Sequence, residues 1–362
     1  MKENRNLGLD IARICAMCGI VILHILGQGG VLTCTSRNDS RYWMIWWIEI
    51  CAYCSVDLFA LLSGWLGIKK KNYSIYRTLE LIAVVIGYCV VITVVAFIIR
   101  PNALGSGKII IKSLVPYLFG RYWYITCYIP IAILQPFINK MLMALSESQH
   151  KKVCVLSVLL FSLIPTVLNR DLFAFGQGYS FIWLVICYMI GAYLKRRNDT
   201  INRNHISKRT CAIVFLMCSL ILLAGKAIYD FIFKVDGHYF IEYTSPIVLL
   251  MSVVTLLFME QLKVKIGSRF IEKMSTMAFD VYIIHCHILI FDIIICNHFR
   301  WVADMPVFLI PFVVVLLAVI IYLLLSVIGI IRSFLFEKVY LNKLLKNIAI
   351  KVDKVIYGAE RE

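Results

Sequence analysis

Three ionisable side chains, Asp10, Arg13 and His24, interrupt the first long apolar stretch of the sequence. Arg13 and His24 are eleven residues apart, so on an α-helix they lie within about 20° of the same face and about 16 Å apart along the axis. Asp10 lies within about 40° of that face. Ionisable groups inside a membrane helix are costly, so each is a candidate for function. The stripe combines an acid, a guanidinium and an imidazole.

Two carboxyl groups on the second apolar stretch lie at similar predicted depths. Glu49 is within about 5 Å of the level of His24, and Asp57 is within about 6 Å of the level of Arg13. A carboxylate beside an imidazole orients and polarises it for general-base chemistry. We therefore expect Glu49 to support His24. Two alternatives stay open: Arg13 and Asp57 form a structural ion pair, and Glu49 lies in the membrane interface.

Two further polar groups occur at the ends of apolar stretches. Arg121 precedes Trp123 and Tyr124 at the predicted outer end of one stretch, where the alternative to a site is an aromatic belt. Lys226 and Asp230 are four residues apart, and this spacing favours a salt bridge on the helix surface rather than a site.

The sequence offers few candidates for metal ligands. His285 and His287 are two residues apart, which places their rings about 200° apart on a regular helix, so at most one faces a cavity. Two Cys-x-x-Cys spacings occur within apolar runs, where cysteine is most often a small packing residue; a thiol or metal site is the alternative. We expect no metal.

The composition is that of an integral membrane protein. Of the 362 residues, 61% are hydrophobic and 16% are charged, against about 45–50% and about 25% in soluble domains. No nucleic-acid-binding signature occurs, and no loop is long enough for a soluble catalytic domain. Ten apolar stretches have about the length that crosses a bilayer: 7–27, 43–67, 79–99, 116–138, 153–168, 179–194, 210–233, 244–259, 276–298 and 307–335.

The distribution of Lys and Arg predicts the orientation of these stretches. Alternate connections, starting from the N-terminus, carry 26 of the 37 Lys and Arg residues, and the opposite set carries 8. Cytoplasmic loops carry the excess of positive charge. We therefore predict an all-α integral membrane protein with about ten transmembrane helices and both termini in the cytoplasm. This distribution also explains the net charge of +16 without a nucleic-acid partner.

The chain divides into a polytopic membrane domain, residues 1–336, and a C-terminal tail, residues 337–362. In the tail, apolar residues at helical spacing alternate with four lysines. This pattern is typical of an amphipathic helix on the anionic cytoplasmic leaflet. A solvated, frayed end is the alternative.

Four segments resemble the membrane-bound acyltransferase 3 family of bacterial O-acyltransferases. The first, LGLDIARICAMCGIVILHILG, is similar to the family's Arg/Lys-x10-His signature. The others are VDLFALLSGWLG at 56–67, RYWYITCYIPIAILQPFIN at 121–139, and MSTMAFDVYIIHCHI, which holds Tyr282 and His285. The resemblance runs from residue 7 to about 335. It departs from the family where an Arg-x-x-Arg pair is expected, because only Lys69–Lys71 and Arg77 occur there, and no hydrolase-like domain is appended.

The resemblance implies transfer of an acyl group, usually acetyl from acetyl-CoA, to a glycan hydroxyl. In that reaction His24 is the general base, with Glu49 behind it, and Arg13 binds the phosphates or the pantetheine chain of CoA. The basic residues expected to assist Arg13 are Lys69, Lys70, Lys71 and Arg77. The residues expected on the acceptor side or as oxyanion donors are Asp10, Asp57, Ser63, Arg121, Trp123, Tyr124 and His285.

The resulting hypothesis is an acyl-CoA-dependent O-acetyltransferase, multi-pass in the bacterial cytoplasmic membrane, that modifies a cell-envelope polysaccharide or its lipid-linked precursor. Its partners are the acyl-CoA donor, the saccharide acceptor and the lipid bilayer. The main alternative is a transporter or flippase for a polar or saccharide substrate. The enzyme is favoured because the helices lack the paired Gly/Pro breaks of transporter half-helices. A ligand-binding sensor without catalysis is a third hypothesis.

Overall fold

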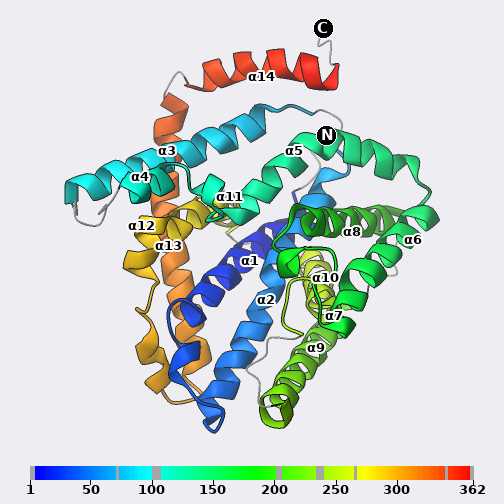
Figure 1. Ribbon diagram of the computed structural model, residues 1–362. Helices are drawn as coiled ribbons and strands as arrows, with labels where there is room; N and C mark the ends of the chain where they lie inside the picture. Colours follow the sequence, from blue (N-terminus) through cyan, green and yellow to red (C-terminus); the bar gives the residue numbers. More distant parts are fainter. Residues whose placement is uncertain are drawn as a thin grey trace.

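The computed structural model describes residues 5–70, 73–99, 107–200, 206–233, 240–264, 267–338 and 341–358. These residues form α-helices with short 3-10 and π segments and no strand (Figure 1). The predicted all-α fold is therefore confirmed. The main helices are α1 (Leu7–Leu26), α2 (Ser40–Gly67), α3 (Tyr76–Ile99), α4 (Gly107–Leu114), α5 (Trp123–Ala144), α6 (Glu147–Val158), α7 (Ile164–Leu168), α8 (Phe181–Thr200), α9 (Lys208–Ile228), α10 (Pro246–Glu260), α11 (Ser268–Cys286), α12 (Ile288–Ile294), α13 (Ile310–Lys338) and α14 (Leu341–Tyr357).

Among the described residues, seven helical segments are long and apolar enough to cross a membrane, or eight if α11 and α12 form one span. The predicted stretch 244–259 corresponds to the shorter apolar helix α10, and 179–194 overlaps the first part of α8. The crossing number of ten and the cytoplasmic termini stay predictions.

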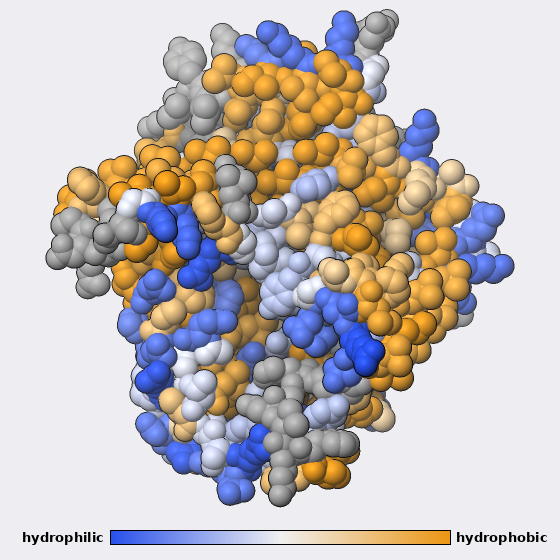
Figure 2. All heavy atoms as spheres, viewed as in Figure 1, coloured by the Kyte–Doolittle hydropathy of each residue, from blue (hydrophilic) through white to orange (hydrophobic). Residues whose placement is uncertain are grey.

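The outer surface of the bundle is apolar. Large side chains on the outer helices are widely exposed, among them Ile98 of α3 at 73% and Phe312 of α13 at 72%. Figure 2 shows apolar residues over much of one face, with hydrophilic residues gathered at the lower left and beside α14 at the top. Such a surface fits lipid, because large exposed apolar patches are rare on soluble monomers.

Helices α1 and α2 form the centre of the bundle (Figure 1). Helix α1 packs against α2, α10, α11 and α13, and α2 packs against α8, α9 and α10. Two glycines allow a close crossing between α2 and α8. A Cβ on Gly64 would lie 1.9 Å from the Tyr188 carbonyl oxygen, and one on Gly191 would lie 2.0 Å from that of Leu61. Small residues at such contacts let membrane helices approach closely.

The predicted stretch 276–298 is broken rather than straight. Helices α11 and α12 meet at an angle of 83°, and His287 stands at the break. Its Nδ1 accepts a hydrogen bond from the Leu289 amide (3.3 Å), and its Nε2 lies 3.0 Å from the Ser113 carbonyl oxygen. His287 therefore caps α12 and fastens it to α4, which leaves His285 in the last turn of α11.

Candidate active site

A cavity of about 650 Å³, the central cavity, lies among α1, α2, α3, α5 and α11. Arg13 and His24 both line it, which agrees with their predicted common face. The other cationic and polar side chains in its wall include Gln28, Ser63, Lys70, Arg77, Arg121, Tyr124, Gln135 and Tyr282. Among the described lining residues there are four Arg or Lys side chains and no carboxylate.

Arg13 is held by polar contacts near the N-terminal end of α1. Its Nη1 donates to Ser275 Oγ (2.8 Å) and lies 3.4 Å from Asp10 Oδ1. Asp10 also accepts from Arg5 at 2.6 and 2.8 Å and from Ser275 Oγ at 2.8 Å. Asp10 is buried and does not line the central cavity. Asp10 therefore positions Arg13 without itself facing the central cavity.

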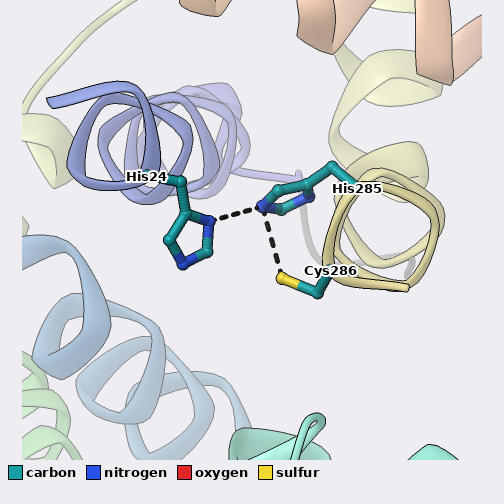
Figure 3. A group of neighbouring side chains, drawn as sticks. All are labelled: His24, His285 and Cys286. Atoms are coloured by element: carbon teal, nitrogen blue, oxygen red, sulfur yellow. Dashed lines mark hydrogen bonds between the residues drawn. The ribbon is translucent and has the colours of Figure 1, made fainter. Parts of the chain in front are cut away.

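His24 is paired with His285 rather than with a carboxylate. Its Nδ1 lies 3.1 Å from His285 Nε2, and the rings face each other across α1 and α11 (Figure 3). His285 Nδ1 lies 2.6 Å from the Val281 carbonyl oxygen. A carbonyl oxygen only accepts, so His285 carries its proton on Nδ1, and its Nε2 in the neutral ring is an acceptor.

These contacts determine the tautomer of His24. With both rings neutral, His24 Nδ1 donates its proton to His285 Nε2, and His24 Nε2 keeps a free lone pair. This second nitrogen points away from His285 (Figure 3). Since His24 lines the central cavity, its basic nitrogen is available to a molecule bound there. The arrangement resembles a catalytic triad in which His285 stands in the place of the acid and is itself oriented by the Val281 carbonyl oxygen.

Glu49 does not contact His24. It is buried in α2, does not line the central cavity, and its Oε2 has no hydrogen-bond partner among the described residues. The expectation that Glu49 orients His24 is not met in this structure, because the ring of His285 occupies that position. The Glu49 carboxyl group and the His24 imidazole share a predicted depth. Depth alone does not determine which faces of the two helices meet.

Asp57 and Ser63, further along α2, have different surroundings. Asp57 is fully buried, accepts from Trp183 Nε1 (2.9 Å) and does not line the central cavity. It makes no ion pair with Arg13 among the described contacts. Ser63 lines the cavity, and its hydroxyl donates to the Phe59 carbonyl oxygen (2.9 Å). Ser63 therefore offers lone pairs rather than a free proton.

Aromatic side chains enclose one end of the central cavity. Trp123, Tyr124, Tyr179 and Tyr243 all line it. The Trp123 ring centre lies 4.6 Å from that of Tyr179, and those of Tyr179 and Tyr243 are 5.0 Å apart. Arg121 lines the same cavity. Trp123 and Tyr124 thus take part in a cavity wall rather than only in an aromatic belt.

Arg121 lies close to His24 through a shared ring. Its guanidinium carbon is 5.5 Å from the Phe291 ring centre, and that ring is 5.3 Å from the ring of His24. A cation beside the base is well placed to stabilise negative charge that develops next to it.

A second cavity of about 660 Å³ adjoins the central one, and both include Lys70, Arg77, Tyr128 and Gln135 in their walls. Lys69 lines neither cavity and pairs with Asp199 of α8. Lys71 lies outside the described residues. Of the four predicted basic helpers of Arg13, the structure therefore brings Lys70 and Arg77 to the cavities.

Sequence reasoning gave Tyr282 no role of its own, although it belongs to a recognised segment. Tyr282 lines the central cavity, and its hydroxyl is buried with no hydrogen-bond partner among the described residues. Its ring centre is 6.2 Å from that of His285. The three-residue spacing to His285 was the available signal, because it places both side chains on neighbouring parts of one helix face.

One group of side chains has the donor set of a metal site. His24, His285 and Cys286 each offer one ligand atom, and these atoms lie within 4.8 Å of one another. Histidine and cysteine are typical zinc ligands. The direct hydrogen bond between the two rings and the 3.4 Å contact from Cys286 Sγ to His285 Nε2 give these atoms partners within the chain (Figure 3).

Lys226 and Asp230 form the predicted ion pair, at 2.8 Å, but it is not on the helix surface. Both side chains are fully buried. Tyr42 donates its hydroxyl proton to Asp230 (2.6 Å), and the Lys226 ammonium lies 4.2 Å from the Trp46 ring centre. The surface position is wrong because the N-terminal part of α2 packs against the C-terminal part of α9 there.

Comparison with known proteins assigns the family. The family model for the acyltransferase 3 family, an acyltransferase domain, matches residues 6–331. The chain belongs to this family. Within the match lie the whole central cavity and both histidines of the pair. No curated protein and no solved structure matches the chain. The match supports a membrane acyltransferase and leaves the acyl donor and acceptor open.

Proposed function

We propose that this acyltransferase moves an acyl group, acetyl in the first instance, from acyl-CoA on the cytoplasmic side to a hydroxyl of a saccharide. The acceptor is a cell-envelope polysaccharide or its lipid-linked precursor, and the membrane is the bacterial cytoplasmic membrane. The observation that carries the proposal is the free Nε2 of His24. His24 lines a cavity that adjoins a second, cation-lined cavity.

The chemistry requires a base beside the acceptor hydroxyl. His24 Nε2 takes the hydroxyl proton as the acceptor oxygen bonds to the acyl carbon of the thioester. The carbon–sulfur bond then breaks, and the imidazolium of His24 returns the proton to the departing thiolate. An ester and a free thiol result. His285 holds the ring in the tautomer that this step needs, and a well-positioned base contributes about 10²–10⁴-fold to the rate.

Two groups are suited to stabilise the oxyanion that forms on the acyl oxygen. Arg121 supplies a cation near His24, and Tyr282 supplies a buried hydroxyl without a partner among the described residues. Preorganised donors of this kind, aimed at developing charge, are often the largest contribution to catalysis. Tyr124 lines the same wall and is a further candidate.

The charge of the walls favours an anionic donor. Arg13, Lys70 and Arg77 line the central cavity away from the aromatic end, and the lining contains no carboxylate among the described residues. Phosphate groups bind such clusters through charge-assisted hydrogen bonds. In this proposal the phosphates stay near Lys70 and Arg77, and the thioester reaches His24.

The aromatic end of the cavity suits the acceptor. The lining includes the rings of Trp123, Tyr179 and Tyr243 and also the polar side chains of Gln28 and Arg121. Binding sites of this type combine apolar walls with a few oriented polar groups. A sugar ring has apolar C–H faces and polar edges, so it matches both kinds of surface.

The test is acyl transfer by the purified protein in liposomes, with acyl-labelled acetyl-CoA as donor and methyl α-glucoside as the sugar probe. We expect His24→Ala to lower kcat by about 10²–10⁴-fold with little change in donor binding. Arg13→Ala should mainly weaken donor binding. The matched control is Cys15→Ala, an exposed residue of the same helix that lines neither cavity.

Two results would contradict the proposal. A folded wild-type protein that neither binds nor consumes acetyl-CoA would remove the donor assignment and favour a transporter. Full activity in His24→Ala would remove His24 as the base.

A further inference from the structure

The C-terminal helix α14 forms one wall of the second cavity. Lys346, Ala349, Ile350 and Tyr357 of α14 line it. Figure 1 shows α14 across the end of the bundle, next to α3. Helix α14 also packs against α13. It is therefore part of the cavity, which a helix lying only on a lipid surface would not be.

Buried polar contacts fix α14 to the segment that carries Arg77. Asp353 is only 3% exposed, and its carboxylate accepts from Ser74 Oγ and from the Ile75 amide, both at 2.7 Å. These residues directly precede α3, whose second residue is Arg77. One turn further along, at the C-terminal end of α14, the Tyr357 hydroxyl donates to the Ile133 carbonyl oxygen of α5 (3.0 Å).

The fixed geometry brings a third cation to the two cations already described. Lys346 lines the second cavity together with Lys70 and Arg77. The described lining of this cavity contains no carboxylate. Four tyrosines, Tyr73, Tyr76, Tyr128 and Tyr357, also line it. Three cations with aromatic rings suit a ligand that has both phosphate groups and a flat base, because cations pair with phosphate and rings stack on bases.

We propose that α14 completes the binding site for the nucleotide end of the acyl donor and that Lys346 contacts its phosphate groups. This inference rests on the proposed function, because it takes the donor to be a phosphorylated nucleotide thioester. Lys70 and Arg77, which line both cavities, are placed where the donor passes from one cavity to the other. The acyl end then lies in the central cavity with His24.

An anionic lipid headgroup has the same phosphate chemistry as the nucleotide. The position of Lys346 favours the nucleotide, because Lys346 faces a cavity that adjoins the one with His24. Lys351 and Lys354, which lie on the same helix, line neither cavity. A helix that binds only the leaflet would use its lysines alike.

The experiment compares Lys346→Glu with Lys351→Glu in the full-length protein, each in nanodiscs of zwitterionic lipid and in nanodiscs with anionic lipid. Affinity for CoA and the KM for acetyl-CoA are measured. We expect Lys346→Glu to lower the affinity for CoA and to raise the KM for acetyl-CoA, each by about 10- to 100-fold in either lipid, because a charge-assisted hydrogen bond is lost. The kcat should stay within error, and Lys351→Glu should match the wild type.

S-acetylpantetheine, which has no phosphate group, is the second donor. The proposal expects wild type and Lys346→Glu to use it equally, which also shows that the variant is folded. Equal effects of the two lysine substitutions, present only with anionic lipid, would overturn the proposal and assign α14 to the leaflet. Unchanged CoA affinity in Lys346→Glu beside an active wild type would overturn it while the proposed function stands. Absence of CoA binding by the wild type would remove both.

Discussion

Two pairs of ionisable side chains are buried among the helices, Lys226–Asp230 and His24–His285. They differ in whether a polar atom remains available to a ligand. Lys226 and Asp230 are fully buried and close on each other, with Tyr42 and Trp46 around them. His24 instead has a partner on one nitrogen and a cavity on the other side. Both groups have a high cost of burial.

The comparison shows that burial of an ionisable residue does not by itself identify a site. In the Lys226–Asp230 pair, each charge is neutralised by the other, so the pair has a structural function. In the His24–His285 pair, the hydrogen-bond chain ends on a lone pair that faces a cavity. The polar atom that remains available to a ligand distinguishes the reactive group from the structural one.

Breaking the Lys226–Asp230 ion pair should give the largest effect. This effect should be on the stability of the fold rather than on catalysis. Lys226→Met removes the cation nearest to buried Asp230 and leaves the more distant Arg37, whose Nε lies 3.9 Å from Asp230 Oδ2. We therefore expect the fold to be destabilised by up to about 3–5 kcal/mol. Thermal unfolding in detergent measures the loss, and activity per folded molecule should match the wild type. The double variant Lys226→Met/Asp230→Leu should recover much of the stability. A loss of turnover at temperatures where Lys226→Met is folded would contradict the comparison and place this pair in the site.

Removal of His285 tests the His24–His285 pair. His285→Ala takes the acceptor from His24 Nδ1, so the ring is free to rotate and to change tautomer. We expect kcat to fall on the order of 10²-fold, with the KM for the donor unchanged. His285→Gln should recover part of the rate, because its amide oxygen can accept the same proton. Equal rates in the Ala and Gln variants would indicate that His285 contributes only packing.

Local periodicity was enough to predict the α1 face and the helical fold. Arg13 and His24 belong to one helix, so their common face follows from 100° per residue. The apolar stretches predicted the helices, because a segment that crosses the lipid must be long and apolar. The break at His287 was not predicted, because the residues on both sides of it are apolar and the cap depends on a distant carbonyl, that of Ser113.

The partner of His24 could not be predicted from spacing. His24 and His285 are separated by 261 residues, and their contact depends on how α1 and α11 pack. Predicted depth placed Glu49 near the level of His24 but gave no information on the direction of its side chain. Lys346 was assigned to a lipid-facing tail for a similar reason, since an amphipathic pattern does not reveal that a helix covers a cavity.

The smallest expected effect is that of Glu49→Gln, which decides between Glu49, the predicted support of His24, and His285, its partner in the structure. The substitution keeps the side-chain volume and removes the carboxylate. Because Glu49 neither lines the central cavity nor contacts His24, kcat should change by less than about threefold, or about 0.7 kcal/mol. The unfolding temperature should not fall, since a buried carboxylate oxygen without a partner is costly. The assay is the liposome reaction beside His285→Ala. A loss in Glu49→Gln as large as that in His285→Ala would mean that the carboxylate acts on the base during turnover, and the tautomer assigned from the ring contacts would then be incomplete.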